Sequence, residues 1–212
     1  MRRLLQLSTI ASAIIVLQAC APLAQRPLDV SLKHPEVIQV LTSGMELITF
    51  QASAPQKPLH TISIKGLKKG DSIIGMDYSA SQKTMYVVAL SGQVYTLDGS
   101  QGTLTPRGSN PNIKLTGSSF GVALEPNSEY LRVLSNKGQN LRFKTETGVL
   151  ASVDNTLFYA ENDNQESSVS NVAASVYAPT QFAIDVRLGT LVHQTANTAT
   201  NSGSLTTIGH LN

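Results

Sequence analysis

An internal repeat constrains this chain more than any other feature of its sequence. When the sequence is shifted by 46 residues, three motifs fall on one another: Ile74-Gly75 on Phe120-Gly121, Gly92-Gln93 on Gly138-Gln139, and Gly102-Thr103-Leu104 on Gly148-Val149-Leu150. An earlier partial copy covers residues 37–50, and a later, looser copy covers residues 182–205. A repeat of this length indicates one supersecondary unit stacked several times.

Each copy contains short apolar runs bounded by Gly, Asn, Ser or Pro. The clearest run, 86–90, is followed by the turn Ser91-Gly92 and a second run at 94–97, a pattern that predicts a β-hairpin. No amphipathic helical period follows residue 35. Three or four strands per copy predict an all-β, propeller-like array of about four repeated antiparallel blades. Four blades are the low end for propellers, so ring closure stays open.

The N-terminus has the features of an export signal. Arg2 and Arg3 precede an apolar run from Leu4 to Leu17, which is shorter than the roughly 20 residues that span a bilayer. The run ends in Leu17-Gln18-Ala19-Cys20, which resembles a bacterial lipobox. In such signals the cysteine thiol takes a lipid through a thioether, and cleavage before it frees an amine for a further acyl chain such as palmitate. Several acyl chains make a firm anchor.

These features divide the chain into three predicted parts. Residues 1–19 form a lipoprotein signal peptide, residues 20–35 a polar, proline-punctuated lipidated tether, and residues 36–212 the propeller-like repeat domain. Ala21, rather than Asp, follows the cysteine, and the resemblance to Gram-negative lipoproteins then implies the periplasmic side of the outer membrane. The alternative is an ordinary signal peptide in which Cys20 carries no lipid.

The charge balance and the cysteine count exclude several classes of protein. The chain has 16 basic and 14 acidic residues, and loss of Arg2 and Arg3 with the signal would leave it neutral. A neutral domain has no broad basic surface for nucleic acid. One cysteine makes neither an internal disulfide nor a thiolate zinc site.

The central motifs resemble a known family. Ser118-Ser119-Phe120-Gly121, Glu129 to Ser135 and Gly138 to Arg142 are similar to the T-S-F-G, D-R-I-R-V-V-S and G-Q-N-L-R motifs of the bacterial domain of unknown function 4394 family. The resemblance covers roughly residues 36–210 and implies no activity. Glu125 stands where the family usually has Asn, and Glu129-Tyr130 replaces its Asp-Arg pair.

The candidate ligand-binding residues are four polar side chains of one predicted hairpin: Arg132, Gln139, Asn140 and Arg142. Arg132 and Arg142 are expected to face each other across it, where like charges repel unless an anion or carboxylate lies between them. Two interpretations stay open. One is structural pairing with Glu129, Glu146 or Asp77, and the other is a site for an anionic ligand or a glycan.

A metal site is the second candidate. The run from Glu161 to Glu166 supplies three carboxylates, those of Glu161, Asp163 and Glu166, which suit a hard cation such as calcium. The run lacks the glycine and the ligand spacing of an EF-hand, so a solvated acidic loop is the alternative. Apart from calcium, the sequence predicts no cofactor.

No catalytic residue is predicted. Gly117-Ser118-Ser119-Phe120-Gly121 matches the pattern of a nucleophile elbow, which needs a helix after the serine, whereas residues 122–124 are strand-like. The four histidines are scattered along the chain. Asp77 and Asp185 follow apolar strand residues and are interpreted as hydrogen-bonding turns between blades.

The leading hypothesis is therefore a non-enzymatic binding or scaffold module of the cell envelope. Its partners would be the membrane, through the lipid, and an envelope glycan or protein. The alternative is a hydrolase or lyase acting on envelope carbohydrate or lactone substrates, because propellers can also build catalytic sites at their axis. A purely structural envelope protein is the third possibility.

Overall fold

The computed structural model describes residues 36–125, 129–195 and 203–211. The predicted signal peptide, Cys20 and the tether lie outside these residues. Every regular element in the described ranges is a β-strand. None of the described residues forms a helix that is long and apolar enough to cross a membrane.

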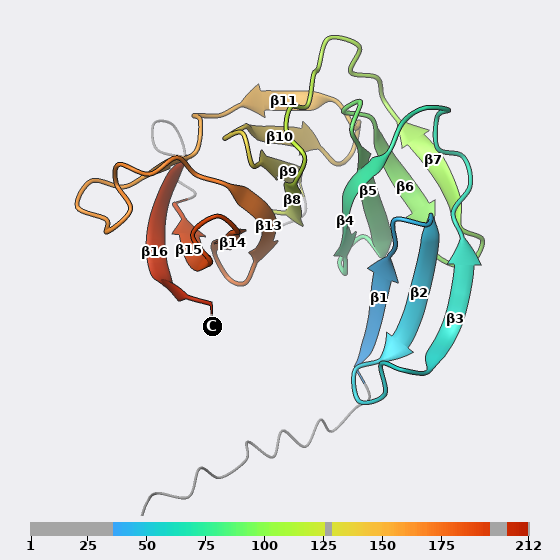
Figure 1. Cartoon of the computed structure of the whole chain (residues 1–212). Coiled ribbons are helices and arrows are strands. Elements are labelled where there is room, and N and C mark those ends of the chain that lie inside the picture. Colours follow the sequence, from blue (N-terminus) through green and yellow to red (C-terminus); the bar gives the residue numbers. More distant parts are fainter. Residues whose placement is uncertain (1–35, 126–128, 196–202, 212) are drawn as a thin grey trace, which may run out of the picture. The chain divides into compact units, whose positions relative to one another are not determined.

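The strands form four sheets that follow one another along the chain (Figure 1). Blade 1 contains β1 (Val37–Leu41), β2 (Glu46–Gln51) and β3 (Pro58–Ser63). Blade 2 contains β4 (Ile73–Ser79), β5 (Thr84–Ala89), β6 (Val94–Asp98) and β7 (Thr103–Arg107). In both of these blades the strands are ordered as they occur in the sequence.

Blade 3 contains β8 (Phe120–Leu124), β9 (Tyr130–Ser135), β10 (Asn140–Lys144) and β11 (Leu150–Val153). Blade 4 contains β12 (Phe158–Tyr159), β13 (Val172–Tyr177), β14 (Gln181–Asp185), β15 (Thr190–Gln194) and β16 (Ser204–His210). Its order is β12-β16-β15-β14-β13, and β12 pairs with β16 in parallel. The other strand pairs within the four sheets are antiparallel. The predicted array of four propeller blades is confirmed, and its ring is not closed.

The continuous apolar runs of β5 and β9 arise because each strand is buried on both faces. Successive side chains of a strand point to opposite faces. In β9, Leu131 and Val133 enter a core shared with blade 2, while Leu134 enters the core shared with blade 4. The same alternation sends Tyr86 and Val88 of β5 toward blade 3, so each middle blade supplies two cores.

The repeated glycines mark where neighbouring chain segments approach most closely. Gly102, Gly148 and Gly203 each precede the outermost long strand of a blade, and the linker from the preceding blade crosses there. An added Cβ on Gly102, Gly148 or Gly203 would meet the carbonyl oxygen of Ser63, Arg107 or Thr156, respectively. The third repeat motif is therefore a crossing point between blades, which explains its spacing.

Replacing Gly148 with alanine is expected to lower the free energy of unfolding by about 2–4 kcal/mol. Gly148 has a φ of +71°, and its new Cβ would also collide with backbone atoms of Arg107, so strain and overpacking add. Gly189 is the matched control, because its φ is +61° and no atom lies near its Cβ position. Urea denaturation should show a loss of only about 1 kcal/mol for Gly189→Ala. Equal losses for the two variants would contradict the crossing.

Candidate functional site

The two arginines of the predicted polar set face each other, as expected. Arg132 on β9 is the direct cross-strand partner of Arg142 on β10. Because Arg132 alternates with Leu131 and Val133, its side chain lies on the face of blade 3 that packs against blade 4, where Tyr177 of β13 contacts it. The Arg132 side chain is only 3% exposed, whereas that of Arg142 is 28% exposed.

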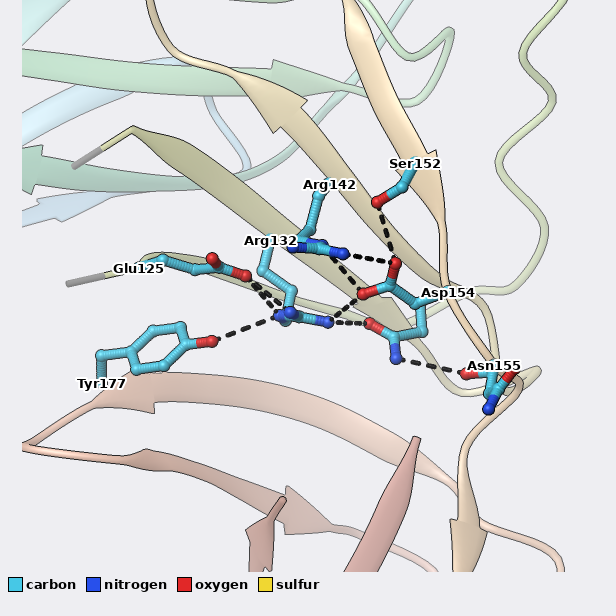
Figure 2. Close-up of polar contacts among 8 residues, drawn as sticks. Glu125, Arg132, Arg142, Ser152, Asp154, Asn155 and Tyr177 are labelled. Atoms are coloured by element: carbon cyan, nitrogen blue, oxygen red, sulfur yellow. Dashed lines mark hydrogen bonds and ion pairs between the residues drawn. The ribbon is translucent and has the colours of Figure 1, made fainter. Parts of the chain in front are cut away.

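The carboxylates that hold this arginine pair were not anticipated. Asp154, just after β11, accepts a hydrogen bond from Arg132 Nη1 and another from Arg142 Nη2, both at 2.9 Å, and its Oδ2 also lies 2.9 Å from Arg142 Nε as an ion pair. Glu125, just after β8, lies 2.6 Å from Arg132 Nη2 and 2.9 Å from its Nε. Figure 2 shows Asp154 between the two guanidinium groups. The expected partners were wrong: the ion pairs are not made by Glu129, Glu146 or Asp77.

Neutral groups complete the surroundings of Arg132. Asn140 Oδ1 accepts from Nη1 at 2.6 Å, and the Tyr177 hydroxyl accepts from Nε at 3.2 Å. Asn140 is oriented in turn by donating to the Asn155 carbonyl at 3.2 Å. Every nitrogen of the Arg132 guanidinium therefore has a partner within the protein, which is how a buried charge is tolerated.

The electrostatics of the cluster follow from this arrangement. Burial alone would raise the pKa of Asp154, but hydrogen bonds from Arg142 and Ser152 and the charge of Arg132 outweigh it, so the net pKa is lowered. Burial alone would lower the pKa of Arg132, but its interactions with the Tyr177 hydroxyl and with the carboxylates of Glu125 and Asp154 outweigh this, so the net pKa is raised. Burial raises the pKa of Tyr177 to about 12, which keeps the phenol neutral.

Arg132, the buried member of the pair, finds all its partners within the protein, and both arginines form ion pairs with Asp154. This geometry fits the structural interpretation of the pair. Tyr130 adds to it, since the Arg142 guanidinium carbon lies 5.5 Å from the centre of the Tyr130 ring. Glu125 and Tyr130 are both positions at which this chain departs from the family motifs, and both contact the pair.

Gln139, the fourth residue of the predicted polar set, lies apart from the arginines. It accepts from Thr116 N at 2.6 Å and donates to the Lys114 carbonyl at 3.0 Å, and so holds the linker between blades 2 and 3.

The acidic loop near residue 163 is held by protein contacts. Asp163 accepts from the backbone and hydroxyl of Thr207 at 2.6 and 2.8 Å, and from Gln165 N at 2.8 Å. Glu166 accepts from Asn162 N at 3.0 Å. In the described ranges, no three His, Cys, Asp or Glu side chains are grouped closely enough to hold a metal ion. Glu161, Asp163 and Glu166 are thus not brought together as one set of ligands.

Asp77 and Asp185 both accept hydrogen bonds, but only Asp77 does so between blades, as the sequence suggested for both. Asp77 on β4 accepts from Leu124 N on β8 at 2.7 Å, which joins blades 2 and 3. Asp185 instead works within blade 4, where it accepts from Tyr159 Oη and from the backbone of Asn171, both at 2.8 Å.

The serine motif that precedes β8 forms a clamped turn. Asn136 accepts from Ser118 N at 3.0 Å, donates to Ser118 Oγ at 3.1 Å, and donates its own backbone N–H to the Ser119 carbonyl at 3.0 Å. A strand, β8, follows Ser119. The motif is therefore not the strand-turn-helix of a nucleophile elbow.

This turn borders a pocket that sequence reasoning missed. We call it the inner-strand pocket, because it lies where β4, β8 and β13 begin. β4 and β8 are the first strands of blades 2 and 3, and β13 is the first long strand of blade 4. It has a volume of about 430 Å³, within the usual range for ligand sites. Apart from Gly117, the described residues that line it have either an apolar or a hydroxyl side chain: Ser72, Ile73, Ile74, Leu90, Ser118, Ser119, Phe120 and Ala173.

Two β-bulges shape the inner-strand pocket. Ile74 is the extra residue where the β4–β5 register shifts between Ile73 and Gly75. Ala173 is the extra residue where the β13–β14 register shifts between Val172 and Ala174. Both bulged residues line the pocket, and bulges commonly re-aim side chains beside functional sites. The Ser118–Gly121 motif was the one sequence signal at this place.

Comparisons with known proteins agree with the family resemblance. The family model described as Domain of unknown function (DUF4394) matches residues 46–212. No match was found among curated proteins.

Two solved structures are similar in arrangement. One is dihydro-heme d1 dehydrogenase NirN in complex with DHE, at 12% identity and a TM-score of 0.46, with 83% of this chain and 35% of that chain covered. The other is a structural genomics protein of unknown function from Bacteroides thetaiotaomicron VPI-5482, at 15% identity and a TM-score of 0.47, with 78% of this chain and 41% of that chain covered. This chain therefore spans less than half the length of either. Because the family model covers most of its sequence, the chain belongs to the DUF4394 family.

Proposed function

We propose that this chain is a lipoprotein of the cell envelope whose propeller domain binds an uncharged, hydroxyl-bearing ligand, such as a stretch of envelope glycan, in the inner-strand pocket. The observation that carries the proposal is the pair of bulges at Ile74 of blade 2 and Ala173 of blade 4, which both border one pocket at the start of β8 in the blade between them. Its described lining has hydroxyls to hydrogen-bond a sugar and the Phe120 ring to lie against one, but no ionisable side chain. A neutral ligand suits such a lining, because a charged group would lose its hydration without an opposite charge in return.

A blocking variant tests the binding proposal. The chain with Ala173→Leu should lose the thermal stabilisation that a panel of neutral envelope glycan fragments gives the wild type, because the longer side chain fills part of the pocket. Ala174→Leu is the matched control, since Ala174 is exposed and does not line the pocket. We expect wild-type stabilisation for the control and at least a tenfold weaker response for Ala173→Leu. No stabilisation of the wild type by any fragment would contradict the proposal.

Lipidation at Cys20 is the second part of the proposal and has its own test. Globomycin, which blocks cleavage of lipoprotein signal peptides, should make the full-length precursor accumulate, and Cys20→Ala should release the domain from the outer membrane fraction. The proposal rests on Arg2, Arg3, the short apolar run and the Leu17–Cys20 motif. Normal maturation in globomycin, or unchanged fractionation of Cys20→Ala, would overturn it.

A further inference from the structure

A second hollow, of about 620 Å³, lies between blades 1 and 2. We call it the methionine hollow, after two of the six apolar residues that line it: Leu41, Met45, Leu67, Ile73, Ile74 and Met76. All of these except Ile74 also pack against the core that blades 1 and 2 share. The methionine hollow is therefore an apolar surface that continues this core outward.

The methionine hollow and the inner-strand pocket have a common border. Residues 72–74 line both of them. Ile73 packs against the core of blades 1 and 2, whereas Ile74 packs against the core of blades 2 and 3, so this short segment has one hollow on each side. It begins β4, which is the edge strand of blade 2 and pairs with β5 alone among the described strands. The free edge of β4 is therefore a route from one hollow to the other.

The two hollows differ in their chemistry. The inner-strand pocket has hydroxyl groups and the Phe120 ring, whereas the methionine hollow is lined mainly by side chains that neither donate nor accept hydrogen bonds. Hydrocarbon suits such a lining, because its burial is favourable without any hydrogen bond and unbranched Met side chains adapt to irregular shapes. A peptide suits it less well, since each of its amides needs a partner.

The charges around the methionine hollow favour a neutral occupant. Among the described residues that line it, Asp71 alone is ionisable. The Asp71 carboxylate accepts from Ser72 N at 2.9 Å, from Ser91 N at 3.1 Å and from the Ser91 hydroxyl. A carboxylate in this position repels an anionic ligand, and the lining of the inner-strand pocket offers no charge to an ionic head group.

We propose that the two hollows together hold a neutral glycolipid, with its sugar in the inner-strand pocket and its alkyl or acyl chain in the methionine hollow. This inference rests on the proposed function, from which it takes the sugar site, and it adds the chain. The chain would pass over residues 72–74. Met76 also borders a smaller hollow of about 290 Å³, which Val37 and Met85 line as well, so the apolar surface continues along β4.

Alkyl β-glucosides of increasing length, used below their micelle-forming concentrations, test the proposal on the full chain. In isothermal titration the affinity should rise about two- to fourfold for each CH₂ group from hexyl to octyl glucoside, since full burial of one CH₂ gives about fourfold. Sodium octanoate, which has an anionic end instead of a sugar, should bind at least tenfold more weakly than octyl glucoside. Equal affinities of hexyl and octyl glucoside would overturn the proposal.

Two variants test whether the chain lies in the methionine hollow. Met76→Glu places a charge in it and should abolish the dependence on chain length. Ser43→Trp fills part of it from an exposed turn, without touching the core, and should weaken octyl glucoside binding at least tenfold. Leu59→Glu is the matched control for the added charge, because Leu59 is 47% exposed and lines neither hollow. Wild-type binding in both Met76→Glu and Ser43→Trp would overturn the proposal.

Ala173→Leu separates this inference from the proposed function. If both are right, the variant binds every glucoside at least tenfold more weakly than the wild type. If Ala173→Leu blocks glycan fragments but longer alkyl chains bring no gain in affinity, the glycolipid is overturned and the sugar site stands. If affinity rises with chain length but Ala173→Leu binds like the wild type, the sugar site is overturned, and the proposed function with it.

Discussion

Replacing Asp154 with asparagine is expected to lower the free energy of unfolding by about 3–5 kcal/mol. The Asp154 side chain is 5% exposed and neutralises both Arg132 and Arg142, so its loss leaves buried positive charge that Glu125 alone does not balance. Urea denaturation at pH 7 measures the change. Glu146→Gln is the matched control, because Glu146 is exposed and was an expected partner of the pair; a change within about 0.5 kcal/mol is expected for it. Similar losses for the two variants would contradict the assigned ion pairs.

The Asp154 carboxylate should also account for part of the loss of folding stability at acid pH. The net pKa of Asp154 in the folded protein lies below its ordinary value of 3.8, so the unfolded chain binds this proton first as the pH falls. The stabilisation by Asp154 is therefore complete above about pH 4 and is lost as the pH falls through the folded-state pKa. Asp154→Asn should remove this component from the pH dependence of the free energy of unfolding. If the free energy of unfolding depends on pH in the same way in the variant and in the wild type, the assigned role of Asp154 is contradicted.

Truncating Phe143 to alanine is the second change with a large expected effect, about 3–5 kcal/mol. Phe143 lies on β10, has no exposed surface, and belongs to the core that blades 2 and 3 share. Its removal leaves a cavity between two blades, so the whole domain should unfold at lower urea concentration in one transition. Phe158→Ala, at a position 42% exposed, should cost much less. Separate transitions for the blades would contradict a shared core.

The repeat was sufficient to predict the blades because its motifs encode backbone geometry. Gly92 and Gly138 mark turns, and Gly148 marks a crossing that only a residue without Cβ allows. The pairing of Arg132 with Arg142 was also predictable, because a short hairpin fixes which residues face each other. These features all depend on residues close in sequence or at the repeat period.

The partners of the arginines and the pocket were not predictable in this way. Asp154 follows β11 and Tyr177 belongs to another blade, so their approach to Arg132 depends on how strands twist and blades pack. The bulges at Ile74 and Ala173 leave no mark in the apolar pattern, because each is one extra small or apolar residue within a strand. Long-range packing, rather than local preference, forms both features.

The most direct test of the account compares the inner-strand pocket with the arginine cluster as the place where a ligand binds. Isothermal titration of a stabilising glycan fragment into the wild type, Ala173→Leu and Arg142→Gln separates the two, because Arg142 is the partly exposed member of the cluster. We expect Arg142→Gln to bind within about twofold of the wild type and Ala173→Leu to bind at least tenfold more weakly. Loss of binding in Arg142→Gln with wild-type affinity in Ala173→Leu would contradict the account.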